Sequence, residues 1–159
     1  MIDFELIYKT YWQKIYRLCM GFLNDQEWAK DITQDIFIIV YKELPKFRND
    51  ASIGTWIFRI ATNNCLRQIE KSKKMLKTEI NREFEDIIQP NKDKKTDFLY
   101  KCISELQEIE RIIISLELEE VKQSEIALIV GITETNVRVK IHRIKEKIAI
   151  KFKNYEEYY

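Results

Sequence analysis

Glycine and proline are rare in this chain, and their scarcity limits the folds that it can adopt. Its 159 residues include three glycines and two prolines. Folds built from many short strands depend on tight turns, which these residue types usually supply. Apolar residues instead recur at intervals of three and four, which is the spacing of one face of an α-helix. We therefore expect an all-α fold.

Three helices are expected in the first part of the chain. Asp3 is placed to cap the first helix, and the segment from Gly21 to Asp25 offers a break after it. Pro45 ends the second helix, because proline disfavours helical geometry in the residue before it. A polar loop follows, and the third helix fades near Lys71. Three helices joined by short connections can enclose one core.

A charged stretch separates these helices from a second group. Between residues 73 and 97 apolar residues are sparse and Pro90 interrupts any regular pattern, so we expect a flexible linker, with one helical turn around Ile80–Ile88. A single amphipathic helix then begins near Phe98 and continues to Leu116. The sequence therefore predicts two small helical domains, at residues 1–72 and 98–159.

The segment from Gln123 to Lys147 has the spacing of a helix-turn-helix motif. A short helix leads to a turn at Gly131, and Thr133 can cap the longer helix that follows. The residues of this segment expected to face the core are Ile132, Val137, Ile141 and Ile144. Those left to project outward are Thr135, Asn136, Arg138, Val139, Lys140, His142 and Arg143. Such a face suits base edges and phosphates, and a plain helical hairpin is the alternative.

Charges are unevenly distributed, although the formal net charge is only +1. Basic residues gather at 59–82 and 136–153, and acidic residues gather at 25–35 and 117–125. This separation indicates that different surfaces meet different partners. For any single run, a solvated helix face is the alternative.

Two further patterns lie in the second and third helices. On the second helix, spacing of three and four places one row on a single face, namely Asp31, Gln34, Asp35 and Ile38. This row suits a basic protein partner, with a solvated face as the alternative. The third helix follows a polar loop that holds Phe47, and it carries Asn63, Asn64 and Arg67. Aromatic and amide groups beside basic residues suit an unpaired base, whereas Trp56 is expected in the core.

The sequence offers no support for catalysis, a cofactor or a metal site. Its one histidine, His142, lies in the basic helix, and no glycine-rich phosphate loop is present. Three widely spaced cysteines fit neither disulfides nor zinc ligands, so we expect buried free thiols in a reducing cytoplasm. Membrane insertion is not expected, because every apolar stretch is short, and no signal peptide is evident. These observations favour a cytoplasmic binding protein.

In their order and spacing, the motifs resemble those of sigma factors of the sigma-70 family. They are a DxxQDxF helix, a loop that ends in TW and is followed by IA and N, and the pattern EIA…GIT…NV…R. The lack of other domains resembles the extracytoplasmic-function (ECF) group. The likeness covers nearly the whole chain except the linker and the residues after about Ile150. It implies that bacterial core RNA polymerase and promoter DNA are partners, and it allows an anti-sigma factor as another.

The resemblance also implies roles for individual residues. Those that match the helix docking on the polymerase clamp helices are Asp31, Gln34, Asp35 and Phe37. Those that match minus-ten contacts are the loop Phe47–Gly54, which captures a flipped base, with Asn63 and Arg67 beside it. Those that match recognition-helix positions facing the minus-thirty-five element are Arg138, Val139, His142 and Arg143. Val139 stands where the family often has serine, so contact with a thymine methyl is the alternative to a hydrogen bond there.

Two other functions remain as alternatives. A stand-alone helix-turn-helix regulator would bind duplex DNA without polymerase, and it would not need the acidic face of the second helix. A helical protein-interaction module would not depend on Arg138 and Arg143.

Overall fold

A computed structural model describes residues 2–78 and 93–158 of the chain. Within these ranges helices form most of the structure and no strand occurs, which confirms the all-α prediction. The elements are α1 (Phe4–Leu23), α2 (Gln26–Glu43), the 3₁₀ turn η1 (Leu44–Lys46), α3 (Ile53–Thr78), α4 (Lys94–Ser104), α5 (Glu108–Leu118), α6 (Gln123–Val130) and α7 (Glu134–Tyr158).

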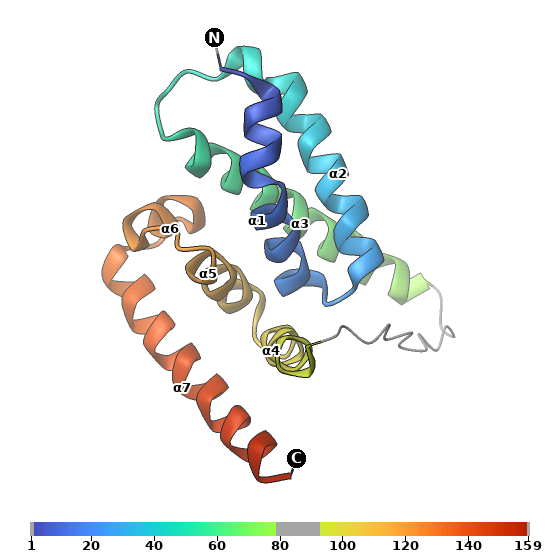
Figure 1. Ribbon diagram of the computed structural model, residues 1–159, viewed down its shortest axis with the longest axis vertical. Coiled ribbons are helices and arrows are strands. Elements are labelled where there is room, and N and C mark those ends of the chain that lie inside the picture. The colour runs from blue at the N-terminus through green and yellow to red at the C-terminus, as the bar shows by residue number, and fades with distance from the viewer. Residues whose placement is uncertain (1, 79–92, 159) are drawn as a thin grey trace.

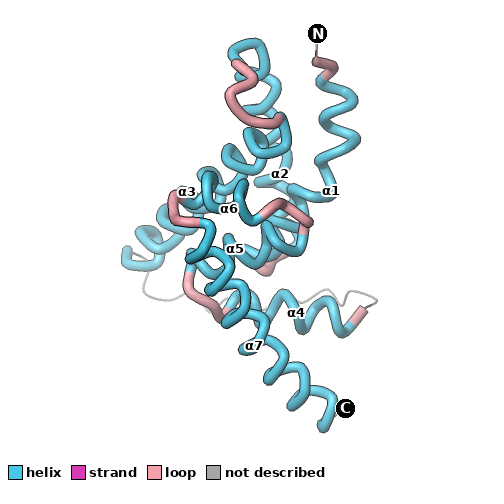
Figure 2. Tube along the Cα trace, turned by 90° about the vertical axis from the view of Figure 1, so that its left-hand side faces the viewer, coloured by secondary structure: helices cyan, strands magenta, loops and turns pink. Residues whose placement is uncertain are grey.

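The helices form two groups that follow each other along the chain. In the first group α1 and α2 run antiparallel, and α3 crosses them (Figure 1). In the second group α4, α5 and α6 lie between the first group and α7 (Figure 1). Figure 2 shows that α7 continues past α4 toward the C-terminal end of the molecule.

The two groups share one hydrophobic core. Helices α4 and α5 pack against α1, and α5 and α6 pack against α3. Fully buried side chains come from both groups, including Ile15 and Leu18 on α1 and Ile113 and Leu116 on α5. Each side chain of this kind stabilises the fold by about 1.5–3 kcal/mol when it is fully buried. The sequence predicted two domains and a linker, but it did not predict that the domains would touch.

Local sequence signals determine several helix ends. The Asp3 carboxylate accepts a hydrogen bond from the backbone N–H of Glu5 at 3.0 Å, and Asp25 does the same for α2. Ser52 caps α3, because its Oγ accepts from the backbone N–H of Thr55 at 3.1 Å. Caps of this kind are worth about 1 kcal/mol each. The expected cap at Asp3 is therefore confirmed, and α2 ends at Glu43, just before the turn that contains Pro45.

The break predicted between Gly21 and Asp25 falls at Asn24 and Asp25, whereas Gly21 itself lies inside α1. The helix continues to Leu23 and ends at Asn24, whose φ of 48° is left-handed and whose N–H bonds to the carbonyl of Met20 at 2.9 Å. A Cβ added at residue 21 would overlap Oγ of Ser115 and would lie 3.1 Å from its Cβ. Gly21 is therefore required by the close approach of α5, which sequence periodicity does not reveal.

The amphipathic helix expected from Phe98 to Leu116 is in fact two helices, α4 and α5. The chain turns between them, and Gln107 adopts an extended conformation with a ψ of 154°. Leu106 lies in this turn and is nevertheless buried, so the apolar spacing continues across the break and hides it. Because of this bend both α4 and α5 pack against α1. A single straight helix would run away from α1 after its first few turns.

Helix also extends into both ends of the stretch expected to be a linker. α3 continues to Thr78, and α4 begins at Lys94 after Asp93, whose carboxylate accepts from the N–H of Lys95 at 3.0 Å. The helical turn expected around Ile80–Ile88 lies outside the described residues. Among the described helices, none is both long enough and apolar enough to cross a bilayer.

Candidate nucleic-acid and polymerase interfaces

Helices α6 and α7 form the predicted helix-turn-helix. The chain turns at Gly131, whose φ of 79° is left-handed and whose N–H bonds to the carbonyl of Ala127 at 2.8 Å. A Cβ at this position would meet no atom within 4 Å, so glycine is favoured here by backbone conformation and not by space. Thr133 Oγ1 accepts from the N–H of Asn136 at 3.2 Å, which confirms the predicted cap of α7.

The first part of α7 has one buried face and one exposed face. The residues buried against α5 and α6 are Val137, Ile141 and Ile144, as predicted. Those exposed are Thr135, Asn136, Arg138, Val139, His142 and Arg143, also as predicted, whereas Lys140 is half-buried. Val139 is 42% exposed. The exposed face thus combines two guanidinium groups, an imidazole and an apolar side chain.

Three lysines of the basic run point instead toward acidic residues of the same group of helices. Lys145 pairs with Glu117 of α5 at 3.3 Å, and Lys147 pairs with Glu110 of α5 at 3.1 Å. Lys151 pairs with Glu105, which follows α4. The basic run at 136–153 therefore does two things. Its first part presents charge outward, and its later part holds α7 against its neighbours.

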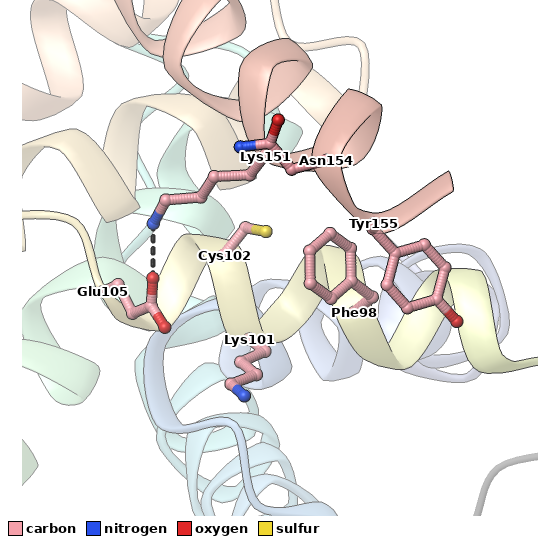
Figure 3. A pocket seen from close by; sticks show the side chains of 7 residues that line it. All are labelled: Phe98, Lys101, Cys102, Glu105, Lys151, Asn154 and Tyr155. Atoms are coloured by element: carbon pink, nitrogen blue, oxygen red, sulfur yellow. Dashed lines mark hydrogen bonds and ion pairs between the residues drawn. The ribbon is translucent and has the colours of Figure 1, made fainter. Parts of the chain in front are cut away.

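The end of α7 is held by aromatic contacts as well as by charge. The ring of Phe98 on α4 stacks on Tyr155 with centroids 4.3 Å apart, and it meets Phe152 edge-on at 5.0 Å. Phe98 and Tyr155 border a hollow of about 580 Å³ between α4 and α7, which Cys102 and the Glu105–Lys151 pair also line (Figure 3). Anchoring at this end and at the turn fixes the direction in which the exposed face of α7 points.

The outer face of α2 carries the acidic row. Asp31, Gln34 and Asp35 are exposed, and Ile38 beside them is 53% exposed. Phe37, which the resemblance placed among the docking residues, is only 3% exposed, and its ring packs edge-on against Tyr8 of α1 with centroids 5.0 Å apart. This burial gives Phe37 the role of holding α2 on α1 and not that of a direct contact. Ile38 is the apolar side chain that the face presents.

The loop before α3 brings two aromatic side chains together. The rings of Phe47 and Trp56 lie with centroids 5.0 Å apart at an angle of 44°, and both are half-buried. Asn49, between them in the chain, adopts a left-handed φ of 58°. Sequence analysis placed Trp56 in the core and did not anticipate this pair, because a loop that folds back has no periodicity to reveal it.

Helix α3 presents an exposed stripe at four-residue spacing. Its members, here called the α3 stripe, are Arg59, Asn63, Arg67 and Lys71. The helix faces the core with other residues, including Ile57, Ala61 and Cys65, which are fully buried. The structure therefore confirms that Asn63 and Arg67 share one accessible face, and it adds a basic residue on each side of them.

The three cysteines are buried free thiols, as predicted. Sγ of Cys19 and Sγ of Cys65 lie 3.7 Å apart between α1 and α3. This hydrogen bond, together with burial, raises the pKa of Cys65 well above its usual value, so the reactive thiolate is disfavoured. Among the described residues, no group of three or more His, Cys, Asp or Glu side chains is placed to hold a metal ion.

Comparison with known families accounts for both groups of helices. The model of sigma-70 region 2 matches residues 7–75, and the model of sigma-70 region 4 matches residues 99–148. The chain belongs to the sigma-70 family of RNA polymerase sigma factors. In this sigma factor we call α1–α3 the region 2 unit and α4–α7 the region 4 unit. The motif resemblance is thereby confirmed.

Relatives align over nearly the full length of this sigma factor. The RNA polymerase sigma factor YlaC of Bacillus subtilis is 28% identical over 151 residues, which cover 89% of this chain and 87% of that protein. The ECF RNA polymerase sigma-E factor of Escherichia coli is 26% identical over 161 residues, which cover 91% of this chain and 84% of that protein. These likenesses place the sigma factor beside relatives of the ECF group.

Solved structures show the same fold. The sigma factor RpoE of Bartonella quintana, crystallised with the anti-sigma factor NepR, superposes with a TM-score of 0.84 at 17% identity, covering 95% of this chain and 97% of that one. CnrH, solved with the cytosolic domain of CnrY, superposes with a TM-score of 0.68 at 17% identity. The match covers 95% of this chain and 88% of CnrH.

Proposed function

We propose that this sigma factor binds bacterial core RNA polymerase through α2 and contacts promoter DNA through α3, the loop before it and α7. The observation that carries the proposal is the exposed face in the first part of α7, the second helix of the helix-turn-helix. The lysines that pair with acids of α5 and with Glu105 lie later in the same helix. Two further exposed faces, each of different chemistry, lie on separate helices of the region 2 unit. One protein thus has distinct surfaces for duplex DNA, for unpaired DNA and for a protein partner.

The exposed face of α7 suits the major groove at the minus-thirty-five element. Arg138 and Arg143 can donate to guanine edges or to phosphates, and His142 lies between them on the same face. Val139, exposed on the same face, can contact the methyl group of a thymine. Lys145, Lys147 and Lys151 contribute by orienting the helix and not by contacting DNA.

The aromatic pair and the α3 stripe suit the melted minus-ten element. Phe47, supported by Trp56, offers a ring on which an unpaired base can stack, an interaction worth about 1–3 kcal/mol per base. Asn63 can hydrogen-bond a base edge, and Arg67 and its basic neighbours can follow the phosphates of the same strand. Stacking an unpaired base offsets part of the free energy needed to separate the strands.

The outer face of α2 suits a basic helical partner, namely the clamp helices of the polymerase. Asp31 and Asp35 supply charge, Gln34 supplies an amide, and Ile38 supplies an apolar contact at the end of the row. An apolar contact beside polar and charged side chains is a common arrangement at protein interfaces.

Several consequences follow from this function. The protein acts by binding and carries out no catalysis itself, and no cofactor is required. It works in the cytoplasm, where core polymerase and the chromosome are found. An anti-sigma factor is a further proposed partner, because both solved relatives described above are complexes with a protein of that kind or with the cytosolic domain of a partner.

Run-off transcription tests the proposal. Core polymerase, with and without the purified chain, is incubated with a library of upstream DNA regions, and discrete start sites that require the chain are expected. A gel shift on the same DNA without polymerase supplies the comparison with a stand-alone regulator. Specific duplex binding without polymerase, combined with no initiation by an active core enzyme, would overturn the proposal.

A further inference from the structure

The exposed face of α7 carries a row of charged side chains that begins with an acid. Four exposed residues at four-residue spacing lie along one side of the helix, namely Glu134, Arg138, His142 and Glu146. We call them the charged row of α7. Nη2 of Arg138 lies 3.8 Å from Oε1 of Glu134, and Nε2 of His142 lies 3.2 Å from Oε1 of Glu146. Each basic group of the row therefore has an acid of its own helix beside it.

Glu134 stands at the end of α7 that a DNA-binding helix presents to the bases. It is the first residue of the helix and directly follows the Thr133 cap. This end of α7 lies beside α6, at the opposite end of the helix from α4 and the C-terminus (Figure 1). In a helix-turn-helix, the first residues of the second helix contact base edges in the major groove. When α7 docks as proposed, the Glu134 carboxylate therefore faces base edges.

A carboxylate at this position has a small structural benefit and a cost. A negative charge in the first turn of an exposed helix, and an exposed ion pair four residues apart, each stabilise the helix only slightly. The side chain of Glu134 is 52% exposed, so both effects are weakened by water. The phosphates of DNA repel the same charge, whatever the base sequence. A contact with a base is needed to offset that repulsion.

The Glu134–Arg138 pair matches the major-groove edge of one kind of base pair. Guanine offers two acceptors there, N7 and O6, and its cytosine offers one donor, the N4 amino group. Cytosine N4 and guanine O6 hydrogen-bond to each other, so they lie about 2.9 Å apart. The 3.8 Å between Oε1 of Glu134 and Nη2 of Arg138 is longer than a hydrogen bond, so both groups keep free capacity for neighbouring base atoms.

An A·T pair fits the same two side chains less well. Its one major-groove donor, adenine N6, lies between two acceptors, adenine N7 and thymine O4. A carboxylate that faces this donor is therefore repelled from both sides. In a G·C pair the donor lies beside only one acceptor, which the guanidinium of Arg138 can bind. The chemistry of the pair thus favours G·C.

We propose that Glu134 determines specificity for a G·C base pair in the minus-thirty-five element. Its carboxylate accepts a hydrogen bond from N4 of the cytosine, and Arg138 donates to O6 and N7 of the guanine in the same pair. Base pairs that place an acceptor opposite the carboxylate are rejected by repulsion, so Glu134 acts through discrimination and not through overall affinity. The inference deepens the proposed function and rests on it, because it requires α7 to dock on promoter DNA.

Transcription from promoter variants tests the assignment. Core polymerase with the wild-type chain or with a variant is incubated with a promoter identified by run-off transcription, and with every single-base change in its minus-thirty-five element. We expect the wild type to prefer G·C in one orientation, at one position, by about 5- to 150-fold. Glu134→Ala should remove most of that preference and leave the preferences at other positions unchanged.

The sign of the change separates base reading from a structural role. On promoters with another base pair at that position, Glu134→Ala should be several-fold more active than the wild type, because a repulsion is removed. A damaged helix would instead lower activity on every promoter. Glu134→Asp keeps the charge in the first turn but shortens the side chain. It should lose the preference for cytosine while its thermal unfolding stays that of the wild type.

Two further variants complete the design. Glu146→Ala removes the acid at the other end of the charged row, about three turns away from Glu134, and should leave every base preference unchanged. Arg138→Ala should act at the same base pair as Glu134→Ala. The double variant should lose less than the product of the two single losses, because both residues read one base pair.

Failure of this inference differs from failure of the proposed function. If the wild type initiates but Glu134→Ala keeps every base preference, or loses activity equally on every promoter, Glu134 reads no base and the proposed function stands. If Arg138→Ala acts at a different base pair, the shared contact is overturned. If the wild type directs no transcription with an active core enzyme, the proposed function fails, and this inference fails with it.

Discussion

The two helices that carry DNA-facing residues, α3 and α7, hold their basic side chains in different ways. On α7, Lys145 and Lys147 pair with acids of α5, and Arg138 pairs with Glu134 of its own helix at 3.8 Å. On α3, the stripe from Arg59 to Lys71 is exposed along its length. The contrast teaches that a basic run identifies a DNA-facing helix, whereas the acids on neighbouring helices decide which of its charges are available.

The largest expected effect separates the two faces of α7. Ile144 is fully buried, so Ile144→Ala should lower the free energy of unfolding by about 2–5 kcal/mol, through lost burial and the cavity left behind. Urea denaturation followed by circular dichroism measures it. The neighbouring variant Arg143→Ala is the control and should change unfolding by less than about 0.5 kcal/mol. Equal effects would mean that the two faces are not distinct.

Arg143→Ala should instead act on DNA recognition. If the guanidinium binds one guanine bidentately, its loss should remove about 1–3 kcal/mol of discrimination at a single base pair of the minus-thirty-five element. Transcription from a set of single-base promoter variants measures this value. A uniform loss across all variants would assign Arg143 to a phosphate contact.

Phe47→Ala tests the corresponding claim for the region 2 unit. Loss of base stacking should weaken promoter opening by about 1–3 kcal/mol, while transcription from a template already unpaired over the minus-ten element should fall less. Permanganate footprinting of unpaired thymines reports opening directly. Because Phe47 also packs on Trp56, thermal unfolding of the variant must be compared with that of the wild type.

Asp35→Arg sharpens the comparison by leaving both DNA-facing helices unchanged. Reversing an exposed charge on α2 should weaken binding to core polymerase by about tenfold. The association rate should fall because electrostatic attraction is lost, and the dissociation rate should rise. Fluorescence anisotropy with labelled protein measures the affinity. The exposed control Lys9→Ala, on α1, should bind as the wild type does, and wild-type affinity in Asp35→Arg would remove α2 from the interface.

The smallest effects come from two lysines that differ only in their neighbours. Lys71→Ala, in the α3 stripe, should reduce the slope of log affinity against log salt by about 1, because one phosphate contact is lost. Lys147→Ala should leave that slope unchanged and lower stability by no more than about 1 kcal/mol, as is usual for a partly exposed ion pair. An identical change in slope for both would show that pairing with Glu110 does not withhold charge from DNA.

The features predictable from sequence were those encoded over a few neighbouring residues. Periodicity and caps such as Asp3 and Thr133 located the helices, and the turn at Gly131 located the helix-turn-helix. Contacts between distant segments were not predictable. The burial of Phe37, the pairing of Phe47 with Trp56 and the break before Gln107 each depend on which helices meet. Apolar spacing predicts that a helix face is buried, but it does not predict which other helix covers that face.

Gly21 and Ser115 also constrain how this chain can change over generations. A Cβ at residue 21 would overlap Oγ of Ser115, so residue 21 cannot be enlarged while that serine keeps its present position. We expect a larger residue at position 21 to be accompanied by a shorter side chain, or a changed rotamer, at position 115. We therefore expect the two positions, although far apart in the sequence, to change together.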